Sequence, residues 1–128
     1  MRKKIFLISL ILISVFILVG CDSLLWDGMY DIKYVVSGTA RSVDLTIENS
    51  SGGVFQYSNK SLPWEYVFSV KSSKYNSPFL YVSAQNNNSS GSVTVKIYIK
   101  KSIEENYALF KTSTSKGSYV ISTVYGSL

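Results

Sequence analysis

The chain has 128 residues, one cysteine and no histidine, with a formal net charge of +5. Three of the positive charges are Arg2, Lys3 and Lys4, and the chain from residue 21 onward has ten basic and eight acidic residues. This near balance argues against a nucleic-acid-binding protein. The missing histidine excludes Ser–His and Cys–His catalysis and imidazole metal sites.

Residues 1–20 have the pattern of a secretory signal peptide. The basic start precedes an apolar block of 15 residues, Ile5 to Val19, interrupted only by Ser9 and Ser14. A small residue, Gly20, follows the block. A bilayer-spanning helix needs about 20 apolar residues, so we expect this segment to be cleaved. The alternative is an unprocessed N-terminal membrane anchor.

The four residues Leu18-Val19-Gly20-Cys21 closely resemble the lipobox of bacterial lipoproteins. The resemblance implies that a diacylglycerol is joined to the thiol of Cys21, that cleavage occurs just before it, and that Cys21 then begins the chain. Two or three acyl chains, at about 0.8 kcal/mol per buried CH₂, hold a protein stably on a membrane. We therefore expect a bacterial, extracytoplasmic protein anchored in the cell membrane or outer membrane through Cys21.

The remaining chain is predicted to contain a tether at 21–28 and one domain at 29–128. The seven residues 22–28 reach at most about 25 Å, so the domain is expected close to its membrane. Apolar and polar residues then alternate with a period of two, which indicates half-buried strands. Turns rich in Ser, Asn and Gly separate them. Strands are predicted at 30–37, 43–49, 54–57, 64–70, 79–85, 92–100, 107–112 and 118–125.

This pattern predicts an all-β fold, an antiparallel immunoglobulin-like β-sandwich of seven or eight short strands. Without a disulfide, its stability must come from packing. The sequence shows no internal repeat and no second domain.

Five ordered stretches resemble a known family. They are YVVSGTARSVDLTIEN (34–49), LPW (62–64), VSAQN (82–86), GSVTVKIYI (91–99) and GSYVISTVYG (117–126). Together they resemble the extracytoplasmic domain of the MmpS family, first described in mycobacteria. The resemblance implies a small β-sandwich accessory protein that works beside a large, polytopic RND-type (MmpL) exporter. Relatives tend to have a transmembrane helix in place of the lipobox, and a cysteine pair on two late strands where this chain has Val95 and Val124.

No residue set indicates catalysis. Glu104 and Glu105 are adjacent acidic residues, and on a strand they would point to opposite faces. STSK, at 113–116, matches the S-x-x-K of Ser–Lys acylases, but we expect it in a polar turn instead of at a helix start. We therefore predict that the protein is not an enzyme, and that it holds no metal and no cofactor apart from the covalent lipid.

Two groups of side chains are candidates for contacts with a partner. Trp64, Tyr66 and Phe68 share one face of a predicted strand; we expect them in the core, and the alternative is a sugar-stacking platform.

Lys96, Tyr98 and Lys100 are expected on the outer face of the strand at 92–100, as a possible partner surface. A solvated strand edge explains these lysines, together with Lys101, equally well, and exposed strand tyrosines without a role are common. The predicted function is a non-catalytic accessory protein of an exporter. The alternative is a glycan- or protein-binding module with no transporter partner.

Overall fold

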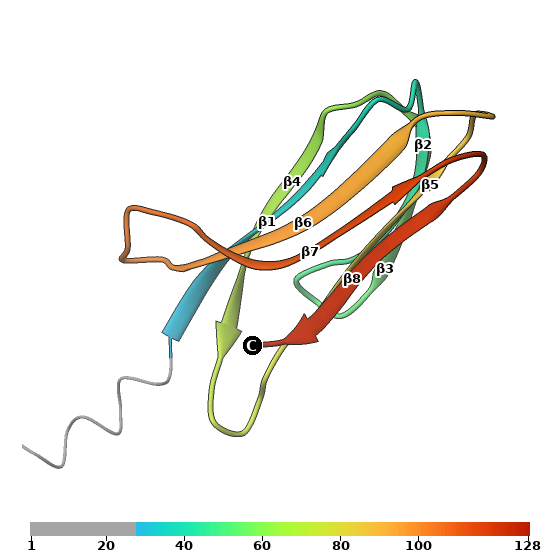
Figure 1. Ribbon diagram of the computed structural model, residues 1–128. Coiled ribbons are helices and arrows are strands. Elements are labelled where there is room, and N and C mark those ends of the chain that lie inside the picture. The colour runs from blue at the N-terminus through green and yellow to red at the C-terminus, as the bar shows by residue number, and fades with distance from the viewer. Residues whose placement is uncertain (1–27) are drawn as a thin grey trace, which may run out of the picture.

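The computed structural model describes residues 28–128, which form eight β-strands and no helix (Figure 1). The strands are β1 (Gly28–Ser37), β2 (Val43–Glu48), β3 (Val54–Lys60), β4 (Trp64–Ser72), β5 (Phe79–Asn86), β6 (Ser92–Lys101), β7 (Ala108–Lys116) and β8 (Ile121–Ser127). The signal peptide, the lipobox with Cys21 and all of the predicted tether except Gly28 lie outside these residues. Gly28 itself opens β1.

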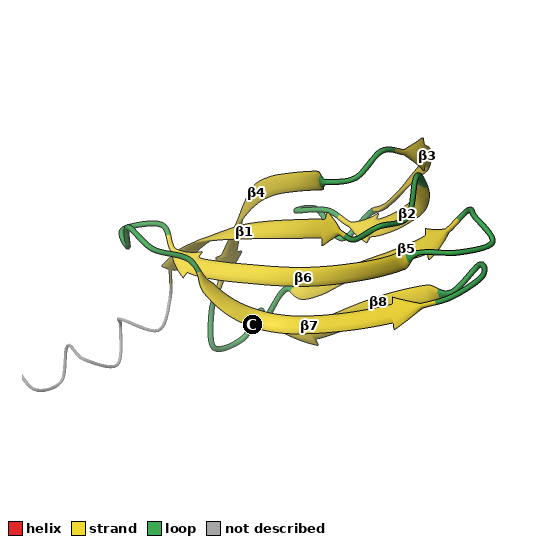
Figure 2. Ribbon diagram, turned by 45° about the horizontal axis from the view of Figure 1, so that its top comes forward, coloured by secondary structure: helices red, strands yellow, loops and turns green. Residues whose placement is uncertain are grey.

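The strands form two antiparallel sheets, ordered β4-β1-β6-β7 and β3-β2-β5-β8, that pack face to face (Figure 2). We call them sheet A and sheet B. The prediction of an antiparallel β-sandwich is confirmed. The likeness to immunoglobulin domains is one of architecture, because β1 and β2 lie in different sheets, whereas the first two strands of an immunoglobulin constant domain pair in one sheet.

The loops gather at two opposite ends of the sandwich (Figure 1). We call the near end the one where β1 starts. Gly28 pairs with Ser72 at the end of β4, and Tyr30 pairs with Lys101 at the end of β6, so the loops after β4 and β6 also lie there. The C-terminal residue Leu128 donates its N–H to the carbonyl of Pro78 at the same end. The far end holds the β1–β2, β5–β6 and β7–β8 turns.

The core lies between the two sheets and is built from alternate residues of each strand. Its buried apolar side chains come mainly from β1, β2, β5 and β6 and include Ile32, Val36, Val43, Leu45, Ile47, Leu80, Val82, Val93, Val95 and Ile97. Val95 and Val124 are both buried, on β6 and β8. Those two strands belong to different sheets and contact each other across the core.

Tyr34 is a polar link between the sheets. Its ring is fully buried in sheet A, while its hydroxyl donates to the carbonyl of Glu48 at 3.0 Å and accepts from the N–H of Tyr81 at 3.2 Å, both in sheet B. Burial raises the pKa of Tyr34 well above its usual value. The hydroxyl therefore keeps its proton, and both bonds persist at any pH at which the fold is stable.

A row of aromatic side chains covers the open side of the sandwich between edge strands β3 and β4. Trp64 stacks on Tyr66 with ring centroids 6.1 Å apart, and Tyr57 of β3 reaches Trp64 at 5.6 Å. Trp64, Tyr66 and Phe68 are half-buried and pack against the core at its margin, outside the set of fully buried core residues. Trp64 does so from the start of an edge strand and not from the centre of the sandwich.

Parts of several of the quoted sequence stretches meet at the far end. Gly38 has φ = 134°, and a Cβ there would lie 2.1 Å from the carbonyl oxygen of Ser92, so only glycine allows the β1–β2 turn to dock on the start of β6. Asn86 is buried, and its amide donates to the carbonyls of Ser90 and Gly117 in the two neighbouring turns. These residues fix the turns of the sandwich.

Candidate functional site

The predicted surface of Lys96, Tyr98 and Lys100 lies on the outer face of β6, because the residues between them, Ile97 and Ile99, pack on the core. The structure corrects one explanation for it. Strand β6 is paired with β1 on one side and β7 on the other, so its lysines cannot serve to protect a sheet edge. They form part of a charged patch on the central strands of sheet A.

Strand β1 adds charged residues to this patch. In register, Lys33 lies beside Tyr98, and Asp31 beside Lys100. The Lys33 ammonium lies 4.4 Å from the ring centre of Tyr107 and 5.4 Å from that of Tyr98, a cation–π arrangement. We define the basic face as Asp31, Lys33, Lys96, Tyr98, Lys100 and Tyr107.

Asp31 makes the polar contacts of the basic face that lie closest to the near end. Its carboxylate accepts hydrogen bonds from the hydroxyls of Ser69 and Ser102, each at 2.8 Å, and lies 3.3 Å from the Lys100 ammonium. These hydroxyls, with a smaller contribution from Lys100, lower the pKa of Asp31. Lys100 also donates to the carbonyl of Glu104. Lys100 is thus a structural residue as well as a surface cation.

Alternation within the strand at 92–100 predicted its outer residues but could not find Lys33, Asp31 and Tyr107. These three come from β1 and from the segment before β7, and strand pairing brings them to β6. The signal that the sequence offered was Asp31 and Lys33, which flank Ile32 and therefore point to the same face of a strand.

The outer face of sheet B has a different composition. The outward positions of β5 and β8 carry no charged residue; they are Phe79, Tyr81, Ser83, Gln85, Ile121, Thr123, Tyr125 and Ser127. The rings of Phe79 and Tyr125 lie 6.1 Å apart, and the hydroxyls of Ser83 and Thr123 share a hydrogen bond of 2.7 Å. We call these eight residues the neutral face.

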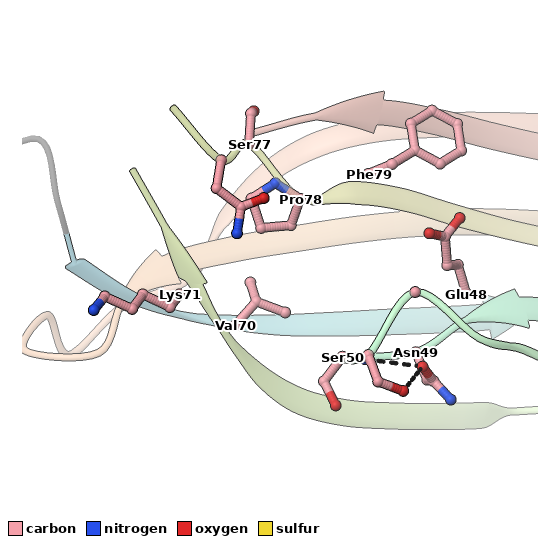
Figure 3. A pocket seen from close by; sticks show the side chains of 11 residues that line it. Glu48, Asn49, Ser50, Val70, Lys71, Ser77, Pro78 and Phe79 are labelled. Atoms are coloured by element: carbon pink, nitrogen blue, oxygen red, sulfur yellow. Dashed lines mark hydrogen bonds between the residues drawn. The ribbon is translucent and has the colours of Figure 1, made fainter. Parts of the chain in front are cut away.

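A cavity of about 420 Å³ opens at the near end, between the β2–β3 turn and the β4–β5 loop (Figure 3). Glu48, Lys71, Val70, Pro78 and Phe79 contribute to its walls, together with the 49–52 turn and residues 76–77. The side-chain amide oxygen of Asn49, Oδ1, is used within its own turn, where it accepts from the N–H groups of Ser51 and Gly53 and from the Ser51 hydroxyl. The cavity wall contains one acidic and one basic side chain, Glu48 and Lys71. It contains neither a pair of carboxylates nor a nucleophile beside a base.

A second cavity, of about 400 Å³, lies at the far end and is lined by Thr39, Arg41, Asn87, Asn88, Ser89, Ser90 and Tyr119. Close by, Asp44 accepts from the N–H of Asn59 and the amide of Asn87. Both bonds lower the pKa of Asp44. The cavity is polar, and its one ionisable cation is Arg41.

The structure also corrects one expectation of the catalytic search and places the adjacent acidic pair. STSK, at 113–116, forms the last residues of β7 and not a turn, and Ser113 accepts a hydrogen bond from the hydroxyl of Ser122. Glu104 and Glu105 lie in the β6–β7 turn and not on a strand, with the Glu104 carboxylate accepting from the N–H of Lys101.

Within residues 28–128, no group of three His, Cys, Asp or Glu side chains is placed to hold a metal ion, and no helix could span a bilayer. The predictions that the protein is not an enzyme and holds no cofactor stay predictions. Comparison of the chain with protein-family models finds no match, and neither does comparison with curated proteins.

Proposed function

We propose that the protein is a lipid-anchored accessory protein of the bacterial cell envelope that binds an RND-type exporter and has no chemistry of its own. The lipobox and the MmpS-like stretches motivate this proposal. The observation that supports it most is the position of the basic face. It lies on the two central strands of sheet A and begins at Asp31, three residues after the chain enters the sandwich.

A tether of six residues, 22–27, keeps that face within reach of the extracytoplasmic part of a membrane protein. The lysines and tyrosines of the face offer charge-assisted hydrogen bonds and aromatic contacts, which are common at protein interfaces. Lys96 lies at the centre of sheet A, in register with Val35 and Thr112. Its neighbours carry no negative charge, so its ammonium can pair with an acidic residue of a partner.

Affinity purification from gently solubilised native membranes, followed by mass spectrometry, tests the proposal. We expect a large polytopic exporter to be retained by the natural chain and lost or weakened with Cys21→Ser, which removes the lipid acceptor. Lys96→Glu should also reduce retention, whereas Lys60→Glu on sheet B makes the same charge change away from the basic face and should not. Recovery of no exporter, or equal losses for both lysine variants, would contradict this function.

The neutral face favours a second candidate, a binding module for envelope or host glycans. Aromatic rings beside hydroxyl and amide side chains suit the apolar ring faces and hydroxyls of sugars, and Tyr125 is 62% exposed. On this alternative, Tyr125→Thr should abolish binding to an immobilised cell-wall polysaccharide. Leu109→Thr, an exposed edge-strand change on sheet A, should preserve it. Binding that is equal for both variants would exclude the neutral face.

A further inference from the structure

The two most exposed large apolar side chains of residues 28–128 both lie at the near end. Ile103 is 93% exposed in the β6–β7 turn, and Tyr75 is 92% exposed in the β4–β5 loop. Water contact of this extent is unfavourable for an isoleucine, which usually lies in the interior. A single exposed side chain needs no explanation, but these two share a position relative to the chain entry.

Strand pairing places the two side chains on either side of the start of β1. Strand β4 ends at Ser72, opposite Gly28, and β6 ends at Lys101, opposite Tyr30. Tyr75 and Ile103 follow those strand ends by three and two residues. The two turns therefore flank the point where the chain enters the sandwich, as Figure 1 also shows.

The turn that carries Ile103 is held in place by several hydrogen bonds. The N–H of Glu104 donates to the carbonyl of Lys101 at 2.8 Å, and the N–H of Ser102 donates to the carbonyl of Met29 at 2.9 Å. The Ser102 hydroxyl donates to Asp31. This turn is thus fixed to β1 on the protein side, while Ile103 points away from it.

The tip at Tyr75 is fixed in a similar way. Ser73 and Asn76 exchange two backbone hydrogen bonds across it, of 2.9 and 3.2 Å, and the Ser73 hydroxyl accepts from the N–H groups of Tyr75 and Asn76. Neither tip can fold back onto the sandwich without losing these bonds. Both apolar side chains are held outward.

The length of chain before β1 indicates what these tips meet. The apolar block ends at Val19, and the eight residues 20–27 that follow reach at most about 28 Å. The near end therefore always lies within this distance of the bilayer, whereas the far end, one β1 length of about 33 Å further on, lies well beyond it when the strand stands upright. This holds whether the block is cleaved at Cys21 or retained. Tyrosine and isoleucine suit the interfacial region, where a ring sits among headgroups and an aliphatic chain reaches the acyl region.

We propose that the near end rests on the bilayer surface, with Ile103 and Tyr75 inserted into its interfacial region on either side of the tether. The proposal rests on the membrane tether of the proposed function and not on its exporter. The occupant of this end is a lipid surface, and electroneutral lipids suffice, because apolar side chains make the contact. The two tips and the tether then hold the sandwich at three points, with its far end directed away from the membrane.

Fluorescence quenching on reconstituted full-length protein tests this. Ile103→Cys and Tyr75→Cys are labelled with nitrobenzoxadiazole in phosphatidylcholine vesicles that contain lipid with a nitroxide on its acyl chain. Tyr119→Cys is the matched control, an exposed turn tyrosine at the far end. We expect the quencher to remove about half of the emission at positions 103 and 75, given an insertion depth of 5–10 Å, and little at 119.

Quenching at 103 and 75 that is no greater than at 119 would overturn the proposal. So would labels at 103 and 75 that the nitroxide lipid leaves unquenched and whose emission changes only when a membrane-protein extract is added, because that would mean a protein partner. The natural chain serves as a labelling control. Uptake of label at Cys21 would show an unmodified thiol, which would count against the lipid anchor separately from the result at the two tips.

Discussion

The outer face of sheet A carries Lys33, Lys96 and Lys100, whereas the outer positions of β5 and β8 in sheet B carry no charge. Both faces come from strands with the same period-two alternation, and both cover one core. The difference is in how polar groups are used. On the basic face they form the Lys100–Asp31 ion pair and cation–π contacts, and on the neutral face hydroxyls and rings face the solvent. One sandwich can therefore present two surfaces suited to different partners.

The largest expected effect comes from the junction that joins the two sheets. In Gly38→Ala, the new methyl group would meet the Ser92 carbonyl oxygen at 2.1 Å, at a φ of 134°. We expect the free energy of unfolding to fall by about 3 kcal/mol or more, since backbone strain and overpacking each cost about 1–3 kcal/mol. Urea denaturation measures it. Gly28→Ala, with no atom within 4 Å of its new methyl, is the control, and equal losses would contradict the steric argument.

The hydrogen bonds of Tyr34 between the two sheets give the next largest effect. Tyr34→Phe keeps the buried ring but leaves the Glu48 carbonyl and the Tyr81 N–H without their partner. Stability should fall by about 1–3 kcal/mol, the cost of unsatisfied buried polar groups. Tyr66→Phe is the matched change in a half-buried stacked ring of the same sheet and should cost less. The same loss in both variants would mean that the link contributes nothing.

One aspartate in each sheet, Asp31 on β1 and Asp44 on β2, gives a smaller, pH-dependent effect. The pKa values of Asp31 and Asp44 are lowered in the folded state, so each stabilises the fold above its unfolded pKa, near 4. Asp31→Asn and Asp44→Asn should lower the melting temperature at pH 7. As the pH falls through the folded pKa values, below about 4, these differences from the natural chain should disappear.

Salt distinguishes the two aspartates. Lys100 lies 3.3 Å from Asp31, whereas the hydrogen bonds to Asp44 come from neutral groups, Asn59 and Asn87. At about 1 M NaCl, where the screening length is about 3 Å, the effect of Asp31→Asn should shrink more than that of Asp44→Asn. Thermal melts at low and high salt measure this. An identical salt response of the two variants would mean that Lys100 contributes no measurable electrostatic stabilisation to Asp31.

The smallest effect on stability is expected for the charge changes that test the partner surface. Lys96→Glu and Lys60→Glu alter side chains that are not part of the core, so each should change the free energy of unfolding by less than about 0.5 kcal/mol. Chemical denaturation of both variants measures it. A larger loss for Lys96→Glu would mean that any reduced exporter retention reflects unfolding and not the loss of a contact.

The sequence predicted every strand of the sandwich, because alternation over six or more residues is strong in β2, β4 and β6. It placed the ends of β3 and β7 too early, since polar residues such as Ser58, Asn59 and Ser113 continue those strands without an apolar signal. Pairing order is set by contacts distant in sequence and was not predicted. For that reason β6 could be mistaken for an edge strand, and Lys33 and Asp31 were not joined to Tyr98.

The position of β1 determines how the protein can carry mechanical load. This strand comes first in the sandwich, so a pull on the N-terminus acts on it before any other strand. Strands β4 and β6 pair with it on either side along its length. If a partner grips the far end or a face, tension between that partner and the membrane acts lengthwise on both ladders. Their hydrogen bonds then resist in shear and together, and not one after another as in an unzipping hairpin. A domain built in this order resists a pull on its N-terminus along the whole length of β1.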